Sequence, residues 1–139
     1  MLDLQTASFH FIWSPEQASY SLVSLPSRYP KIIKAGLDVR YFLDGHARRI
    51  SKLEWSLAVV TFQNQPASPH GPLQYIHLIG ESDRGRLHFE VNFALAEQQP
   101  LFLCQVKLEN RSSHPLSIDS ITFFEAGPDS IHLSPSGQD

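Results

Sequence analysis

The sequence predicts an all-β fold, an antiparallel β-sandwich of about eight strands with little or no helix. Apolar and polar residues alternate with a period of two along much of the chain, which is typical of half-buried strands. Turn-forming residues interrupt the alternation at intervals of about 8 to 14 residues, a spacing that suits a sandwich or a barrel. No helical segment is long enough to connect parallel strands, so antiparallel pairing is the economical arrangement.

Three strands are predicted in the first third of the chain. Residues 8–13 ("SFHFIW") and 18–25 ("ASYSLVSL") are rich in aromatic and β-branched residues and are bounded by the turn sequences "WSPEQASY" and "SLPSRYPK". Residues 35–43 ("AGLDVRYFL") alternate, with Leu37, Val39, Tyr41 and Leu43 on one face. Trp13 shares a face with Phe9 and Phe11, which indicates a core position.

Residues 46–58 leave two alternatives open. A strand is favoured, but Ile50, Leu53, Glu54 and Leu57 also satisfy helical spacing after Asp44, which can serve as a helix N-cap.

Five further strands are predicted after this segment. The firmest is residues 85–95, where every second residue from Leu87 to Leu95 is apolar and His88, Glu90 and Asn92 lie on the other face. The same reasoning applies to residues 57–62, 73–81, 101–109 and 116–125.

The polar stretch 110–115 ("NRSSHP") is interpreted as the loop of a β-hairpin, with the Asn110 and serine side chains bonding the backbone. Asn110 also fits the N-x-[ST] pattern, but a chance match is the safer interpretation because no signal peptide precedes it. We expect one β-sandwich domain over residues 1–127 and a tail or linker over 128–139, where Gly, Pro, Ser and Asp dominate.

Composition limits the classes of function. The chain has 139 residues, a formal net charge of -3 and a pI near 6.1, and its basic residues form no stripe, so nucleic acid is not an expected partner. Only 18% of the residues are charged, which suggests that part of the surface is buried against another molecule. The sequence shows no signal peptide and no apolar run of about 18 residues, so we expect a cytoplasmic chain without membrane contact.

No residue set compels a chemistry. The single cysteine, Cys104, is expected to be an inert thiol within a strand, and no G-x-S-x-G or glycine-rich phosphate loop is present. The seven histidines include no H-x-H pair, so neither a metal nor a cofactor is predicted. One weaker alternative places His77 and His88 face to face on neighbouring strands, with Glu90 nearby, as metal ligands.

Carbohydrate chemistry leaves two further sets of candidates. A carboxylate pair for glycoside hydrolysis would have to come from Glu81, Asp83, Glu90 or Glu125, which nothing distinguishes from ordinary turn and surface acids. Trp55 is the candidate sugar contact, because it stands beside polar and basic neighbours and flat indole faces stack on pyranose rings.

The order of elements resembles a known family. The segments "FHFIWSPEQASYSLVSL", "LQYIHLIGESDRGRLHFEVNFAL" and, after Pro100, "LFLCQVKLENRSSHPLSIDSITFFEAG" are similar to the N-terminal β-sandwich domain that precedes the catalytic barrel in melibiase-type α-galactosidases. In that family a strand ending in an Asn-x-Ser/Gly turn is followed by an apolar strand, and residues 106–123 share this pattern. The resemblance covers most of the chain, although the family domain is usually longer.

The resemblance implies a non-catalytic role. In such enzymes the acid and the nucleophile are aspartates of the barrel, so no catalytic residue is expected here, and the sandwich helps assembly and shapes the sugar pocket. The leading hypothesis is therefore an N-terminal domain of an α-galactosidase-like glycoside hydrolase, with the barrel of the same enzyme as partner. The alternative is a stand-alone carbohydrate-binding or protein-interaction module. A homo-oligomer stays open in both cases.

Overall fold

Eleven strands and one short helix form within the part of the chain that the computed structural model describes, residues 2–125 and 130–133. All eight predicted strands are present. The expected number is too low by three, because β1, β5 and β11 are not among those eight. These strands have only two to four residues, which is too short for an alternation of apolar and polar residues to be recognised in the sequence. In chain order the elements are β1 (Leu2–Gln5), β2 (Phe9–Ser14), β3 (Ser19–Ser24), β4 (Lys31–Leu43), β5 (His46–Arg49), α1 (Lys52–Ser56), β6 (Val59–Gln65), β7 (Leu73–Ser82), β8 (Leu87–Ala96), β9 (Phe102–Asn110), β10 (Leu116–Glu125) and β11 (Ile131–His132).

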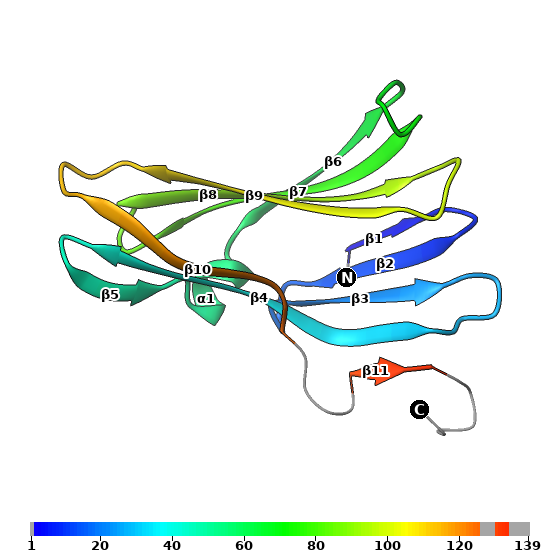
Figure 1. Ribbon diagram of the computed structural model, residues 1–139, viewed down its shortest axis with the longest axis horizontal. Helices are drawn as coiled ribbons and strands as arrows, with labels where there is room; N and C mark the ends of the chain where they lie inside the picture. The colour runs from blue at the N-terminus through cyan, green and yellow to red at the C-terminus, as the bar shows by residue number, and fades with distance from the viewer. Residues whose placement is uncertain (1, 126–129, 134–139) are drawn as a thin grey trace.

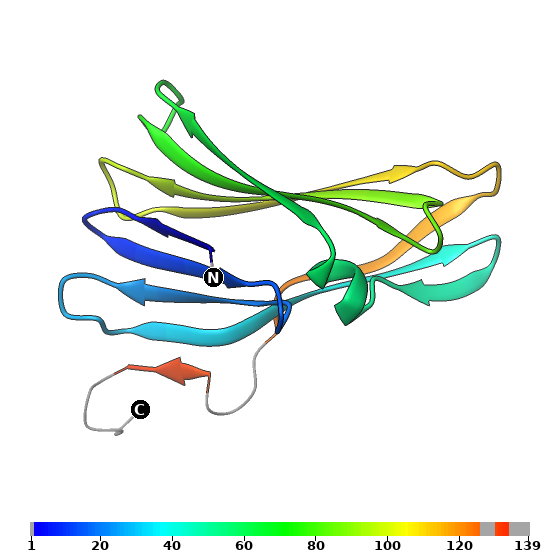
Figure 2. The ribbon, with the colours of Figure 1, turned by 180° about the vertical axis from the view of Figure 1, so that it is seen from behind.

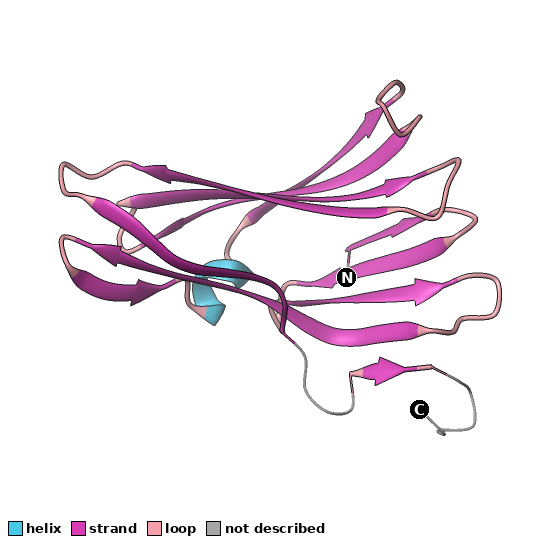
Figure 3. Cartoon of the chain, in the orientation of Figure 1, coloured by secondary structure: helices cyan, strands magenta, loops and turns pink. Residues whose placement is uncertain are grey.

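The strands form two antiparallel sheets that lie face to face (Figure 1). Sheet A has the order β1-β2-β3-β4-β10, and both β5 and β11 pair with β4. Sheet B has the order β6-β7-β8-β9. Almost everything outside the strands is loop or turn, and α1 is the one helix among the described residues (Figure 3). The predicted all-β, antiparallel architecture is therefore confirmed.

Strand β4 connects the parts of sheet A because its thirteen residues pair with four other strands. Its first half pairs with β3 and β11, and the half from Gly36 to Leu43 pairs with β10 and, at the end, with β5. The pairing with β10 shifts register twice, once on either side of Ser120–Thr122. Such irregularities bend an edge strand and increase its twist.

The core lies between the inner faces of the two sheets. Phe93 of β8 is fully buried, and its ring centroid lies 4.7 Å from that of Phe11, 5.9 Å from that of Trp13 and 5.2 Å from that of Tyr20, all of them in sheet A. Trp13 is 1% exposed, which confirms its predicted core position. Burying a side chain of this size contributes roughly 1.5–3 kcal/mol to stability, so these rings account for much of the attachment between the sheets.

Residues 46–58 contain both of the structures that the sequence left open. Residues His46–Arg49 form β5, and a five-residue helix, α1, follows where the chain passes from sheet A to sheet B (Figure 2). Ser51, not Asp44, is the helix N-cap, because the Ser51 side chain accepts a bond from the Glu54 N–H while Glu54 accepts one from the Ser51 N–H. Asp44 lies instead in the β4–β5 turn with a φ of 52°.

The loop 110–115 is not a hairpin, which corrects the prediction. Strand β9 pairs with β8 in sheet B and β10 pairs with β4 in sheet A, so the loop carries the chain from one sheet to the other. The predicted backbone bonds are present: Asn110 Nδ2 donates to the His114 carbonyl at 2.8 Å, and Ser112 N donates to Asn110 Oδ1 at 3.0 Å. Periodicity identifies a strand but not its partner, and face-to-face sheets are only about 10 Å apart, a span that six residues cover easily.

Part of the predicted tail 128–139 pairs with sheet A. Ile131 and His132 of β11 lie opposite Ile32 and Lys31, and the Ile33 N–H donates to the Ser130 carbonyl at 2.8 Å. The rest of that segment, apart from residue 133, lies outside the described residues. A search of the described part of the chain finds no helix with the length and apolar character needed to cross a membrane.

Candidate functional site

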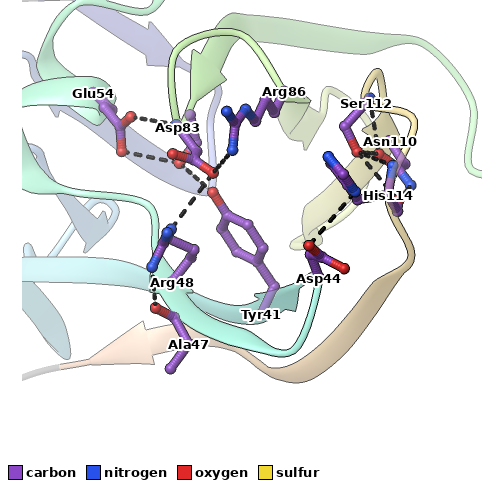
Figure 4. A network of polar contacts seen from close by, with 11 residues as sticks. Tyr41, Asp44, Ala47, Arg48, Glu54, Asp83, Arg86, Asn110, Ser112 and His114 are labelled. Carbon is purple, nitrogen blue, oxygen red and sulfur yellow. Dashed lines mark hydrogen bonds and ion pairs between the residues drawn. The ribbon is translucent and has the colours of Figure 1, made fainter.

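A polar network forms where α1, β4 and the β7–β8 turn meet (Figure 4). The Glu54 carboxylate is its centre, since Oε1 accepts from Ser51 N at 2.8 Å and from Ser82 Oγ at 3.0 Å, while Oε2 accepts from Asp83 N at 2.9 Å. Both oxygens are thus engaged with donors of the protein itself. A carboxylate held in this way fixes the helix to the turn and is poorly placed to take a proton from a substrate.

Tyr41 extends the network into the core. Its hydroxyl lies 2.8 Å from Ser82 Oγ, and because Ser82 gives its only proton to Glu54, Tyr41 acts as the donor in this bond. Tyr41 is 1% exposed, and burial raises the pKa of its hydroxyl above the usual value. The phenol therefore stays neutral at physiological pH and serves as a hydrogen-bond donor to the network.

Asp83 ties the β7–β8 turn to β5. Its carboxylate Oδ2 lies 3.5 Å from Arg48 Nε and 3.9 Å from Arg86 Nη1. The turn holds three successive residues in the left-handed region, with φ of 52° at Asp83, 59° at Arg84 and 85° at Gly85. Two non-glycine residues at positive φ are costly, and the Glu54 and Arg48 contacts stabilise that conformation.

A shallow depression of about 410 Å³ lies beside this network, on the outer side of sheet B. Its polar side chains are Glu54, Glu81 and His88, with Glu81 directly opposite His88 on the neighbouring strand. Leu57, Val59, Ile79 and Gly80 complete the lining. Two carboxylates in one depression are the nearest arrangement to a glycosidase pair, but Glu54 is already engaged as described above.

The histidines that the sequence singled out do not face each other. His77 is opposite Asn92 and His88 is opposite Glu81. The two imidazoles lie near different oxygens of Glu90, with His77 Nε2 at 3.8 Å from Oε2 and His88 Nε2 at 3.5 Å from Oε1. Among residues 2–125 and 130–133, no group of three His, Cys, Asp or Glu side chains is arranged to hold a metal ion. The geometry thus gives the weaker metal hypothesis no support.

The other carboxylates named from the sequence are dispersed. Glu125 belongs to sheet A, where it lies 3.9 Å from Arg49 Nη2, whereas Glu81 and Glu90 belong to sheet B and Asp83 lies in the β7–β8 turn. No acid–nucleophile pair can be assigned to them on the geometry of the strands.

Trp55 is buried, which the sequence did not reveal. Its side chain is 3% exposed, and its ring centroid lies 4.7 Å from that of Phe89. The five-residue helix turns Trp55 inward and leaves Leu53 and Leu57 outside, at 66% and 71% exposure. Stacking on a pyranose needs an exposed ring face, so this position gives no support to the predicted sugar contact. Trp55 is nevertheless among the residues around a second depression of about 470 Å³, together with Gln17, Arg49 and Lys52.

Cys104 lies in β9 and is half-buried. Burial raises the pKa of its thiol to about 12, so the thiolate is scarce at neutral pH. The predicted inert thiol is consistent with this position.

Exposed apolar side chains form the feature that sequence reasoning missed. Two groups of four stand out among the described residues. We call Phe42, Ile118, Phe123 and Phe124, which lie along the β10 edge of sheet A, the β10 patch. Ile118 is opposite the buried Tyr41 and so on the core-side face, whereas Phe42 is on the outer face, and the patch therefore lies on both faces of this edge. We call Leu53, Leu57, Val59 and Phe62, on α1, on its C-terminal cap and on the edge strand β6, the α1–β6 patch. The low charge content was the only signal of these surfaces, and it did not indicate their place.

Comparison with protein-family models, with curated proteins and with solved structures found no significant match in any of the three. The resemblance to the α-galactosidase sandwich therefore stays a prediction from the sequence.

Proposed function

We propose that this chain is a β-sandwich without catalytic residues of its own, which docks through the β10 patch onto another protein domain. The observation that carries the proposal is the exposure of four large apolar side chains, 38% for Phe42, 39% for Phe124 and 42% for both Ile118 and Phe123. Exposed apolar residues scattered singly are normal, but these four lie along one edge of sheet A and on both of its faces, where a docking partner would enclose the edge strand. The small share of charged residues, 18%, fits such a surface.

The polar groups support a non-catalytic role. The Glu54 carboxylate is occupied by three donors of the chain, and Asp83 is paired with two arginines. Asp38, the buried acid of sheet A, accepts from Arg40 Nε at 2.8 Å and from Arg49 Nε at 2.6 Å. Each of these acids holds two elements together, and such contacts account for them without a substrate.

The partner that we favour is the catalytic barrel of an α-galactosidase-like glycoside hydrolase. The support for this partner is the resemblance carried by residues 106–123, in a family where the barrel follows the sandwich. The β10 patch lies on the last long strand of the described chain, a suitable position for contact with a domain that follows. In this role the sandwich assists assembly and helps to shape the sugar pocket.

Carbohydrate binding by the chain itself is the second candidate. The depression of about 470 Å³ favours it, because Gln17, Arg49 and Lys52, which line it, carry hydrogen-bond donors for sugar hydroxyls.

The test begins with the coding sequence beyond Asp139, which we expect to continue into a barrel with an aspartate pair. In the full-length protein, Phe124→Asp should lower the activity on a nitrophenyl α-galactoside and separate the unfolding of sandwich and barrel in calorimetry. Ser120→Asp, on the same strand but outside the patch, is the matched control and should leave both unchanged. A stop codon after Asp139 would remove the barrel proposal.

Calorimetric titration of the chain with galactose and α-galactosides separates the second candidate from the first. Docking without sugar binding predicts no heat of binding at millimolar sugar. Binding that is lost in Lys52→Ala, with the fold retained by circular dichroism, would instead establish a carbohydrate-binding module.

A further inference from the structure

Strand β6 is an edge of sheet B with an unusual degree of exposure. It pairs with β7 alone among the described strands, and its opposite backbone edge faces none of them. Six of its seven residues are exposed, and the seventh, Val60, is half-buried. An edge of this kind presents N–H and C=O groups that can pair with a strand of another chain.

The other edge strands carry features that discourage such pairing, and β6 carries none. Strands β1, β5 and β11 have only two to four residues, β10 has two register shifts, and β9 bears Lys107 and Glu109. The sequence of β6, "VVTFQNQ", has no charge, no Pro and no Gly, and its register with β7 runs without a shift from Val59 to Gln65. Uncharged, regular edges of high β-propensity are those that associate.

Phe62 is a large apolar side chain of β6 that its neighbours leave partly uncovered. It lies opposite Ile76, which is fully buried, so Phe62 belongs to the face of sheet B that covers the core. The Phe62 side chain is nevertheless 53% exposed. Figure 1 shows the reason, since β6 and the adjoining end of β7 turn away from sheet A. An added strand beside β6 would cover the Phe62 ring.

We propose that β6 pairs antiparallel with β6 of a second copy of this chain, which joins two copies of sheet B into one continuous sheet. Phe62 is the middle residue of the seven, so a two-fold axis there places the two Phe62 rings together and Thr61 opposite Gln63 of the other copy. Aromatic cross-strand pairs are favourable. The arrangement is symmetric and closes at two subunits.

The absence of charge on β6 favours a second copy of this chain as the partner over a strand from a different protein. No charged residue lies anywhere on β6, so two identical strands meet without repulsion, whereas a partner strand with charges would find no counter-charge there. The exposed Leu57 and Val59 precede and begin β6 and add apolar side chains at its end, where Val59 is opposite Ile79 on the outer face of sheet B. The interface lies on the α1–β6 patch and is separate from the β10 patch, so it goes beyond the docking role proposed above.

Sedimentation velocity of the whole chain across micromolar to near-millimolar concentrations tests the proposal. We expect a reversible equilibrium between a monomer of 15.7 kDa and a dimer. The double variant Thr61→Lys with Gln63→Lys places lysines opposite lysines in the proposed register and should abolish the dimer. Gln105→Lys on β9, the other edge of sheet B, is the control and should dimerise as the parent chain does.

A charge swap tests the antiparallel register itself. The double lysine variant mixed with Thr61→Glu plus Gln63→Glu should restore a species of dimeric mass, while each variant alone stays monomeric. Circular dichroism confirms that both variants fold, which is expected because Thr61 and Gln63 are exposed. A parent chain that is monomeric throughout, an assembly other than a dimer, or a dimer that survives the lysines would overturn the proposal. None of these results would bear on docking through the β10 patch.

Discussion

Gly80 and Phe89 lie directly opposite each other on β7 and β8, and their fit depends on the missing side chain of glycine. A Cβ built on Gly80 would overlap the Phe89 ring, which is itself fully buried and packed against Trp55. The glycine is therefore required by close packing, since its φ is not in the left-handed region. In the sequence, Gly80 looks only like an interruption of an apolar strand, because periodicity does not indicate that the Phe89 ring packs against it.

Gly80→Ala should destabilise the chain for this reason. The ring and the strand must shift, and overpacking of this kind costs about 1–3 kcal/mol. Urea unfolding followed by tryptophan fluorescence measures the change in the free energy of unfolding. Gly36→Ala is the matched control, because its Cβ would meet only the Glu125 carbonyl at 3.8 Å, an ordinary contact. Equal losses of unfolding free energy in Gly80→Ala and Gly36→Ala would contradict the explanation. Adding Phe89→Leu to Gly80→Ala should recover part of the loss, because the smaller side chain leaves room for the new methyl group.

At the scale of elements, strands that alternate between apolar and polar residues can be predicted from the sequence, whereas the orientation of an element against its neighbours cannot. The eight longer strands, including Leu87–Ala96, follow from alternation alone. Strand β5 and helix α1 take up nine of the thirteen residues 46–58, for which the sequence left both strand and helix open. The Ser51 and Glu54 capping box decides where the helix begins. The two faces of α1 are then fixed by tertiary contact, which is why Trp55 faces inward although its neighbours are polar.

The candidate site was less predictable than the fold, because its members are distant in sequence. Tyr41, Glu54, Ser82 and Asp83 meet through a β4–α1–turn contact that no local pattern encodes. The same holds for the β10 patch, whose exposure depends on which strand becomes an edge.

Glu54→Gln tests the role of the network in holding α1 to the β7–β8 turn. The amide has one acceptor oxygen in place of two, so at least one of the bonds from Ser51, Ser82 and Asp83 is lost or reversed. Hydrogen bonds to charged groups contribute about 1.5–3 kcal/mol, and we expect a loss in unfolding free energy of that order. Glu81→Gln, which changes an exposed carboxylate in the same depression, should cost less than about 0.5 kcal/mol, as is usual for surface substitutions away from structural contacts. Similar losses in both variants would show that Glu54 is no more structural than its neighbour.

At the scale of the whole molecule, the two sheets share one core and should unfold together. The shared core is built from rings contributed by both sheets, with Phe93 of β8 and Phe102 of β9 packed against Phe11 and Tyr20. The loop 110–115 and the segment with α1 connect the sheets covalently at two places. The buried apolar residues of the two sheets form one hydrophobic cluster, so separation of the sheets would expose most of that buried surface at once.

Phe93→Ala is the substitution that tests this cooperativity. It removes a fully buried ring with four aromatic neighbours within 6.1 Å, and truncations of this kind cost about 3–5 kcal/mol. Far-ultraviolet circular dichroism reports both sheets, whereas fluorescence reports Trp13 in sheet A and Trp55 beside sheet B. The two signals should give coincident urea transitions in the parent chain and in the variant, with the midpoint of the variant moved to lower urea.

Phe42→Ala removes an exposed ring and serves as the control, with a change in unfolding free energy of less than about 0.5 kcal/mol expected. Two separate transitions in the parent chain would show that each sheet folds without the other, and a small effect at Phe93 would show that the shared core is not what joins them.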